Sequence, residues 1–430
     1  KLINRARENS TTVEALARQM TQDYFDNLDT MGVDTIDRFP YATEHIPEML
    51  SIIQKLVDSG HAYPLDGDVY FAVDKDADYG KLSRRSVEEM MAGTRVEAVE
   101  RKRNPADFAL WKKSKAGEPA WDSPWGKGRP GWHIECSAMS MKYLGESFDI
   151  HGGGLDLMFP HHENELAQSE SCSGKPFARY WMHNGLMQAG SAAGKVGGGH
   201  NRHGDVVDQA SQEANKLAGS KGAASVKELF AVHAPETVRF FLLSTHYRSP
   251  IEFSDELIGD VGKSLEGFYR LFETYRRVSK VDFYSLPTAP TRMETAPLVG
   301  EPAEFFVELQ HLRDRFLECM DDDFNTGGAI GALFELRKCI NGFIARNKLD
   351  AGAKPGATEL AALTASMTLL KELANLLGVF RKQVAKAGSG DDAFVEGLMK
   401  LFIELRAEAR KSKNFAIADR IRDGLKELKV

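Results

Sequence analysis

The sequence predicts an α/β protein that ends in an all-α helical bundle. The segment Phe148-Asp-Ile-His-Gly-Gly-Gly has the pattern of a strand that ends in a ligand loop, as strands of open α/β sheets do. From Ser225 onward the pattern turns helical and stays so. With 430 residues the chain is too long for one ordinary core, so about two to four domains are expected.

The first elements are two helices and a hairpin. Thr11-Thr-Val-Glu14 is a capping-box pattern, and apolar residues then repeat at helical spacing to about Met31. A second amphipathic helix runs from about Ile46 to Ser59. Asp66-Gly67, followed by alternating Val69, Phe71 and Val73, predicts a β-hairpin.

The C-terminal third is predicted to be a bundle behind a linker. The Pro- and Thr-rich stretch from Asp282 to Pro302 is the expected linker. Five helices follow in the predicted bundle: Phe305 to Met320, Gly328 to Asn347, Glu359 to Leu377, Asp392 to Lys411 and Asn414 to Leu428.

Composition indicates a globular protein with no membrane segment. Hydrophobic residues make up 42% and charged residues 27%. No apolar stretch approaches the roughly eighteen residues of a membrane span. Four scattered cysteines are too few for a disulfide scaffold, and Cys172, Cys319 and Cys339 are predicted to be structural.

A formal net charge of −7 does not by itself indicate a nucleic-acid binder. Basic residues can nevertheless be confined to one surface. Each basic cluster has two interpretations, an RNA contact or a solvated helix face. The clusters are Arg101, Lys102 and Arg103; Arg406, Arg410, Lys411 and Lys413; and Arg420, Arg422 and Lys426.

Cys136, His161 and Glu165 offer a thiolate, an imidazole and a carboxylate, the protein ligand types that zinc prefers. His161 and Glu165 project from one face if Pro160 opens a helix at its first position. Cys136 is expected to reach that face from a separate strand or turn. The alternative is structural, because histidine and glutamate on a helix are usually solvated and a lone cysteine is usually buried.

The neighbours of these residues favour a ligand site. The run Gly131-Trp-His-Ile-Glu-Cys136 places an aromatic ring and polar groups beside the cysteine. Gly153, Gly154 and Asp156 form a turn suited to close approach by a phosphate- or ribose-bearing ligand. A packed core has no need of that density of polar and glycine residues.

Three stretches around these residues closely resemble cysteinyl-tRNA synthetase: Pro130 to Met139, His151 to Glu165, and Tyr180-Trp-Met-His-Asn-Gly185. The resemblance covers most of the chain. Its further motifs are Arg101 to Lys112, Glu236-Thr-Val-Arg-Phe240, Ser244-Thr-His-Tyr-Arg-Ser249 and Met320-Asp-Asp-Asp-Phe-Asn-Thr326.

The resemblance implies the second half of a class I synthetase Rossmann-type nucleotide-binding fold with a mixed insertion, followed by the bundle, which would bind the tRNA anticodon region. The implied domains are a helix from the first half of the catalytic domain (1–31), a connective insertion (32–128), the second half of the Rossmann domain with the zinc site (129–215), the signature loop with stem-contact helices (216–290) and the anticodon-binding bundle (291–430).

The implied activity is ATP-dependent activation of L-cysteine and its transfer to tRNA(Cys), by a cytoplasmic monomer. One zinc ion per subunit, held by Cys136, His161 and Glu165, would select the thiol, because serine offers only a poorly acidic hydroxyl. The remaining implied roles are a substrate pocket of Trp132, His133 and His151, an adenosine site of Gly153, Gly154 and Asp156, and Lys216 with Lys221 against the phosphates of ATP, which enters with magnesium.

The chain departs from the family pattern in two places. It opens at Lys1-Leu-Ile-Asn-Arg, so the family's histidine motif and first zinc cysteine would lie upstream, and the chain is expected to be a fragment. The family's Lys-Met-Ser-Lys-Ser loop is best matched by Lys216 to Ser220, with Gly219 in place of the second lysine and Lys221 as a substitute. Residues 188–215 before it are interpreted as a Gly- and Ala-rich inserted surface loop.

Three alternatives remain open at this level. A ligase that joins cysteine to an amino sugar would share the zinc and adenylate sites but would not need residues 303–430. A non-catalytic binding protein derived from a synthetase is favoured somewhat by Gly219 and the insertion. A zinc hydrolase could use His161 and Glu165, but the flanking motifs disfavour it.

Overall fold

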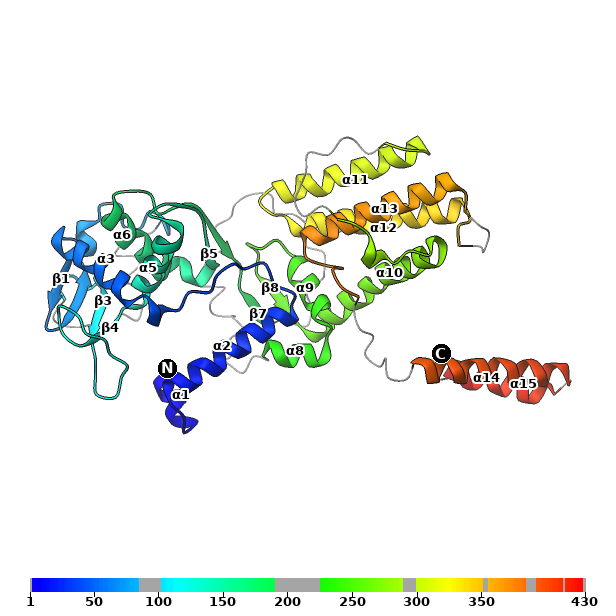
Figure 1. Ribbon diagram of the computed structural model, residues 1–430, viewed down its shortest axis with the longest axis horizontal. Helices are drawn as coiled ribbons and strands as arrows, with labels where there is room; N and C mark the ends of the chain where they lie inside the picture. The colour runs from blue at the N-terminus through cyan, green and yellow to red at the C-terminus, as the bar shows by residue number, and fades with distance from the viewer. Residues whose placement is uncertain are drawn as a thin grey trace. The chain divides into compact units, whose positions relative to one another are not determined.

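The computed structural model describes residues 2–84, 102–189, 225–288, 299–350, 355–383, 392–412 and 414–427. The chain divides into two compact units, Lys1–Phe380 and Arg381–Val430. Figure 1 shows the elements in chain order from blue to red.

The chain begins with two helices, α1 (Leu2–Glu8) and α2 (Val13–Thr30). The N-cap of α2 is Thr12, whose side chain accepts a hydrogen bond from the backbone N–H of Ala15 at 3.1 Å. The expected capping box from Thr11 to Glu14 is therefore wrong by one residue. Glu14 instead forms an ion pair with Arg18, one turn further along the helix, at 3.2 Å.

A four-stranded antiparallel sheet follows, in the order β1 (Ala62–Leu65), β2 (Asp68–Phe71), β3 (Phe108–Lys113) and β4 (Gly128–Pro130). The predicted hairpin is present between β1 and β2. Its turn residues Asp66 and Gly67 have φ of 52° and 92°, as a type I′ turn requires. Val73 lies beyond the strand, in the 3₁₀ turn Val73–Lys75.

Two helices pack on this sheet, α3 (Ile46–Asp58) and α5 (Trp132–Leu144), and α6 (Glu163–Ser173) packs against both of them (Figure 1). The apolar stripe of α3, including Ile53 and Leu56, packs against Trp111 of β3 and Ile134 of α5 in one core. This core fixes α5 and α6 beside each other.

Two parallel strand pairs extend from the helices. β5 (Phe148–Gly154) pairs with β6 (Ala178–Asn184), and β7 (Met187–Ala189) pairs with β8 (Ile251–Phe253). The strand predicted at 148–154 is present. The expectation of helices alone after residue 225 is wrong, because β8 follows α8 and α9. The start of the expected insertion, at residues 188 and 189, belongs to β7.

The first unit continues with six helices: α8 (Val226–Val232), α9 (Pro235–Leu243), α10 (Asp255–Ser279), α11 (Ala303–Asp321), α12 (Thr326–Arg346) and α13 (Ala357–Leu376). One core runs through this bundle from Val238 to Phe380 and crosses the expected boundary at 290/291. Part of the expected linker is ordered against it, because Phe283 stacks on Phe272 with ring centroids 3.8 Å apart.

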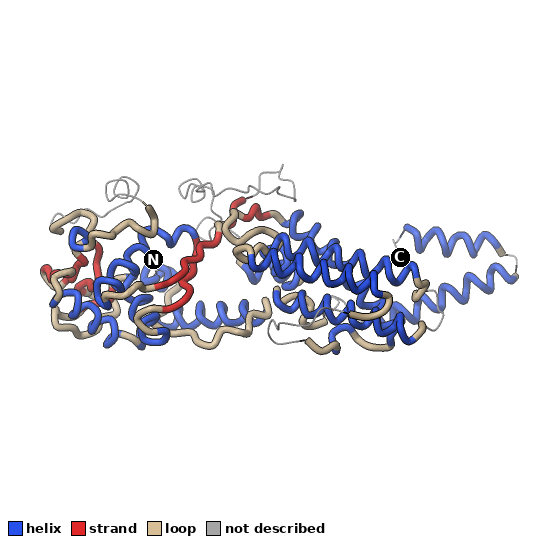
Figure 2. The backbone as a smooth tube through the Cα atoms, turned by 90° about the horizontal axis from the view of Figure 1, so that it is seen from above, coloured by secondary structure: helices blue, strands red, loops and turns tan. Residues whose placement is uncertain are grey.

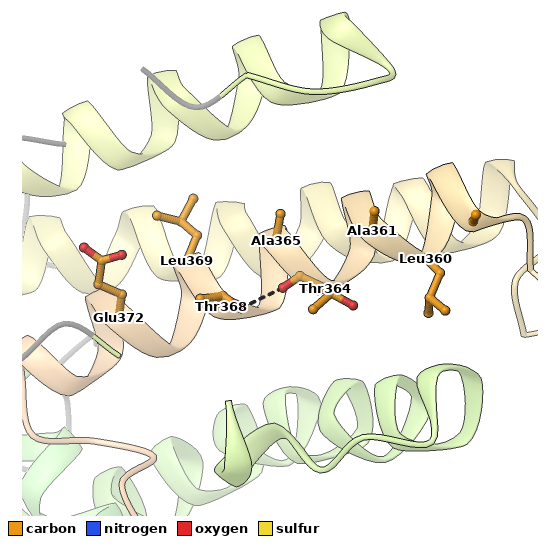
Figure 3. A pocket seen from close by; sticks show the side chains of 8 residues that line it. Leu360, Ala361, Thr364, Ala365, Thr368, Leu369 and Glu372 are labelled. Atoms are coloured by element: carbon orange, nitrogen blue, oxygen red, sulfur yellow. Dashed lines mark hydrogen bonds between the residues drawn. The ribbon is translucent and has the colours of Figure 1, made fainter. Parts of the chain in front are cut away.

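One face of α13 carries small side chains along a groove (Figure 3). Ala361, Thr364 and Ala365 form its middle, and Thr368 donates a hydrogen bond to the backbone oxygen of Thr364 at 2.9 Å. Because the Thr368 hydroxyl donates within its own helix, it offers no free donor to the groove, and the lining is mainly apolar.

The second unit contains two helices, α14 (Asp392–Lys411) and α15 (Phe415–Glu427), which lie side by side (Figure 2). Both helices were predicted, but as members of a five-helix bundle. Ala409 and Ala418 are buried, whereas larger apolar side chains such as Phe402 and Phe415 remain partly exposed. No helix in the described ranges is long and apolar enough to cross a membrane.

Candidate metal centre

The candidate centre lies where α5 and α6 meet. Gly131, the N-cap of α5, donates its N–H to the backbone oxygen of Leu110 in β3 at 2.8 Å. A Cβ at this position would overlap the backbone of Ala109, so only glycine permits the helix to start this close to the sheet. Cys136 lies in the second turn of α5, which corrects the expectation of a strand or turn.

The start of α6 brings His161 and Glu165 to the same face. Phe159 is extended, with φ −133° and ψ 134°, and kinks the backbone within Met158–His162. Only Phe159 departs from helical φ and ψ in this turn, so helical backbone begins at Pro160, as predicted, and continues into α6, which is bounded at Glu163. The four-residue spacing still places the His161 ring against the Glu165 carboxylate, with Nε2 in contact with Oε1.

The three sequence-predicted ligands converge. One ligand atom each from Cys136, His161 and Glu165 lies within 4.8 Å of the others. Ligand atoms at about 2.0 to 2.3 Å from a shared zinc ion would be separated by such distances. A second set, His151, His162 and Glu165, meets the same limit and shares the carboxylate. The residues present therefore fit a divalent cation.

Glu165 is the central acidic group of the site. Its side chain is fully buried, and neither carboxylate oxygen has a hydrogen-bond partner in the described part of the chain. The imidazole nitrogens of His161 and His151 contact its two oxygens, the latter at 2.9 Å, but neither approach has hydrogen-bond alignment. Burial acts to raise the pKa of Glu165, but the contacts with His151 and His161 outweigh it and lower the pKa to about 2. A fully buried carboxylate that stays ionised is suited to bind a divalent cation.

Burial also governs the neighbouring groups. It raises the pKa of the Cys136 thiol, and the nearby carboxylate of Glu165 raises it further. Burial raises the pKa of Glu135 to about 7. It lowers the pKa of His133 to about 3, with repulsion from His161 as the second cause. The imidazole of His133 is therefore neutral near pH 7 and can accept or donate a hydrogen bond.

The expected substrate residues surround the His161 ring. Trp132 stacks on His161 with centroids 4.2 Å apart and an interplanar angle of 26°, yet 55% of Trp132 is exposed. His133 Nδ1 lies 3.0 Å from His161 Nδ1. His151, on β5, contacts Glu165 as described. An exposed aromatic surface beside a candidate metal centre is suited to cover a small ligand.

The glycine turn is closely packed against neighbouring side chains. A Cβ on Gly153 would lie 2.7 Å from Cε1 of His162, and a Cβ on Gly154 would overlap Oδ1 of Asp156. Both glycines therefore leave room for the side chains of His162 and Asp156. Asp156 lies in the 3₁₀ turn Leu155–Leu157, directly after β5.

Sequence reasoning missed several buried polar residues of α6 and β6. Glu163 accepts hydrogen bonds from the backbone N–H groups of Gly80 at 3.0 Å and Ser83 at 2.7 Å. His162 Nδ1 lies 2.8 Å from Nε2 of His183 on β6. The available signal was a helix start with polar residues on every side, a pattern that a solvated or amphipathic helix does not have. Lys216 and Lys221, the expected phosphate contacts, lie outside the described residues.

Comparison with known proteins gives two family matches. Residues 1–194 match the tRNA synthetases class I (C) catalytic domain, and residues 315–381 match the DALR domain. A cysteine–tRNA ligase of Pelotomaculum thermopropionicum is 45% identical over 438 residues, covering 100% of this chain and 82% of the relative. That of Aquifex aeolicus is 42% identical over 440 residues, with the same coverage. The chain belongs to the cysteine–tRNA ligase family.

Members of the cysteine–tRNA ligase family are aminoacyl-tRNA synthetases, so the amino-sugar ligase, the non-catalytic binding protein and the zinc hydrolase are not favoured. The fold agrees with a class I synthetase. The Mycobacterium tuberculosis methionyl-tRNA synthetase in complex with methionyl-adenylate matches with a TM-score of 0.55 at 15% identity, covering 87% of this chain and 80% of the other. At that identity the match shows the fold alone.

Proposed function

We propose that this chain activates L-cysteine with ATP and transfers it to tRNA(Cys), and that one zinc ion held by Cys136, His161 and Glu165 selects the amino acid. The observation that carries the zinc assignment is the convergence of the three ligand atoms within 4.8 Å around a buried carboxylate. Thiolate, imidazole and carboxylate together fit zinc better than magnesium or calcium, which prefer oxygen ligands.

Each residue has a role that follows from its place. Zinc, when bound, would take the thiolate of substrate cysteine as a further ligand, which serine cannot supply at neutral pH. Trp132 would cover the substrate side chain, and stacking keeps the His161 ring oriented. His133, buried and neutral, would fix the tautomer of His161 through the 3.0 Å contact between their Nδ1 atoms.

The nucleotide contacts rest on the sequence resemblance. We assign Asp156 to the ribose hydroxyls, with Gly153 and Gly154 shaping the turn that presents it. Lys216 and Lys221 are assigned to the phosphates of ATP, where positive charge stabilises the transition state. Magnesium, bound with ATP, would supply further positive charge there.

The place of the reaction and the tRNA contacts are also proposals. All four cysteines are free, which is consistent with a reducing cytoplasm. We assign the tRNA anticodon end to the helices from α11 onward, because the DALR domain matches residues 315–381 and exposed arginines follow on α14 and α15. We assign a monomer as the active form.

The proposed function is tested by ATP–pyrophosphate exchange with cysteine, with serine and with no amino acid. We expect exchange with cysteine to exceed that with serine by roughly 10⁴-fold or more, because a polar site that is left unsatisfied rejects its analogue strongly. The protein loaded with Co²⁺ should show a thiolate-to-cobalt charge-transfer band that increases when cysteine is added. Equal exchange with serine would contradict the selection mechanism, and the absence of cysteine-dependent exchange would contradict the enzymatic function.

A further inference from the structure

The motif Glu236-Thr-Val-Arg-Phe240 has no part in the candidate metal centre, yet its two charged residues make contacts over long distances in the sequence. It forms part of α9. Arg239 donates from Nε to the backbone oxygen of Leu377 at 3.2 Å. It also donates from Nη1 to the backbone oxygens of Met31 at 3.0 Å and Gly32 at 3.3 Å. One guanidinium thus binds the C-terminal ends of α2 and of α13.

These carbonyls are places where a cation is favoured. The last carbonyls of a helix have no partner within the helix and carry the negative end of its dipole. Met31 and Leu377 are the C-caps of α2 and α13. The planar guanidinium presents N–H groups on separate nitrogens in fixed directions, and here Nε serves the end of α13 while Nη1 serves the end of α2.

The local backbone is built around the guanidinium. Each helix is followed by a glycine in the left-handed region, Gly32 at φ 70° and Gly378 at φ 69°. A Cβ on Gly378 would lie 2.9 Å from Nε of Arg239 and closer still to the rest of the guanidinium, so a side chain there would displace it. The contact therefore requires both the arginine and the glycine.

Glu236 holds the same segment from the preceding turn of α9. Its Oε1 accepts from the backbone N–H of Phe380 at 2.6 Å, and its Oε2 accepts from the hydroxyl of Tyr269 at 2.5 Å. Phe380 is fully buried and packs against Phe268 and Phe272 of α10. Phe380 is also the last residue of the first unit, after which the chain continues into the second.

We propose that Arg239, supported by Glu236, is a positioning residue for the tRNA-dependent step of the reaction. It joins the end of α2, in the segment that matches the catalytic domain, to the end of α13, in the segment that matches the DALR domain. A tRNA that contacts both segments must meet them at a fixed separation, whereas no residue assigned to cysteine or ATP lies in the segment that matches the DALR domain. This inference rests on the proposed function. Loss of the contact should therefore impair transfer to tRNA and spare the activation of cysteine.

The test compares two reactions of the same protein, cysteine-dependent ATP–pyrophosphate exchange without tRNA and aminoacylation of tRNA(Cys). The variants are Arg239→Met, Arg239→Lys and Gly378→Ala, the last of which disturbs the contact from the opposite side. Arg337→Met is the matched control. Arg337 also donates to a backbone oxygen, that of Ser264 at 3.2 Å, and stacks over Phe268, but its contacts lie within the bundle.

We expect the three variants to lower kcat/KM for tRNA by roughly 10- to 100-fold, as small misplacements far from the chemistry do. In the same three variants the rate of cysteine-dependent ATP–pyrophosphate exchange should stay within about twofold of wild type. Arg337→Met should leave the ratio of aminoacylation to exchange unchanged. Arg239→Lys should recover at most a small part of the loss, because one ammonium nitrogen cannot occupy the positions of both Nε and Nη1.

Several results would overturn the proposal. If exchange and aminoacylation fall in parallel, Arg239 serves only the stability of the fold. If Arg239→Lys restores aminoacylation fully, a positive charge alone suffices and the guanidinium contact with both helix ends has no role of its own. If aminoacylation is unchanged, the contact has no role in transfer. Should Arg239→Met not fold, Gly378→Ala and Glu236→Gln decide by the same ratio. Wild-type protein without cysteine-dependent exchange would instead contradict the proposed function and leave no reaction to position.

Discussion

At the scale of single residues, the candidate centre is organised by the burial of Glu165. Two imidazoles contact its carboxylate and a thiol lies within 4.8 Å, yet both oxygens have no hydrogen-bond partner in the described ranges. A buried anion in this condition is costly unless a cation binds it. Burial raises the pKa of the Cys136 thiol, and the Glu165 carboxylate raises it further. A bound metal ion would instead lower the pKa of this thiol and favour the thiolate.

Substitution of Cys136 by serine should remove zinc from the protein. We expect the zinc affinity to fall by at least about 100-fold, since even residues outside the ligand set cost 10- to 100-fold when changed. Metal analysis after dialysis against a weak chelator gives the measurement. Cys172→Ser is the matched control, because Cys172 is also a partly buried helical cysteine but lies outside both ligand sets. Equal zinc content in the two variants would exclude Cys136 as a ligand.

At the scale of elements, one buried carboxylate, that of Asp107, connects several short strands and turns by hydrogen bonds. Asp107 is 2% exposed and accepts hydrogen bonds from the hydroxyl of Tyr63 at 2.6 Å, from the N–H of Val73 at 3.0 Å and from the N–H of Asn104 at 3.1 Å. It connects the start of β3 to β1 and to the turn after β2. Asp107 lies in the motif Arg101 to Lys112, for which the sequence showed only a family resemblance, and these hydrogen bonds give that motif a structural role.

Asp107→Ala should destabilise the first unit by about 2–4 kcal/mol, because the substitution removes the acceptor of the buried N–H of Val73 and of the buried hydroxyl of Tyr63. Urea unfolding followed by tryptophan fluorescence measures the change, since Trp111 lies in the adjacent core. Asp122→Ala serves as the control, because the Asp122 side chain is 88% exposed and lies 3.8 Å from its partner Lys127. Similar midpoints for the two variants would contradict this role for Asp107.

Gly185 joins β6 to the loop before β8. Its N–H donates to the oxygen of Tyr247 at 2.7 Å, and a Cβ there would lie 2.7 Å from the nitrogen of Pro250. Gly185→Ala should therefore cost about 1–3 kcal/mol, as overpacking does. Gly342→Ala, in α12 with open space around the glycine, should stabilise by up to about 1 kcal/mol. Thermal unfolding of both variants tests the pair, and a gain in stability for Gly185→Ala would show that the loop adapts.

At the scale of the whole molecule, a protein of net charge −7 is proposed to bind RNA through local basic surfaces. On the second unit Arg410 and Arg420 are exposed. Arg422 differs, because it forms ion pairs with Asp419 at 3.0 Å and Asp423 at 2.8 Å. A residue already paired with carboxylates gains less from a phosphate than an exposed one does.

Arg410→Ala and Arg420→Ala should each weaken binding of tRNA(Cys) to the full chain and reduce the slope of log affinity against log salt by about 0.7–0.9. Arg422→Ala should change the slope less. Filter binding between roughly 50 and 200 mM salt covers the range in which phosphate contacts are resolved. Lys263→Ala on α10, whose lysine forms an ion pair with Asp260, is the control. Unchanged slopes for Arg410 and Arg420 would identify them as a solvated helix face.

The sequence by itself determined the features that depend on neighbours along the chain. Apolar periodicity located α3 and α11–α15 to within a few residues, and Asp66-Gly67 located the hairpin. Ligand types and the spacing of His161 and Glu165 marked the candidate centre, because a helical turn brings residues four apart together whatever the rest of the fold does.

Only the tertiary structure decided how distant segments meet. It placed Cys136 on a helix, filled the space beside Gly153 with His162, and inserted β8 among the predicted helices. It also revealed Arg239 between helix ends that are 207 and 138 residues away from it. Such contacts depend on packing and on the satisfaction of buried polar groups, and neither leaves a periodic signal in the sequence.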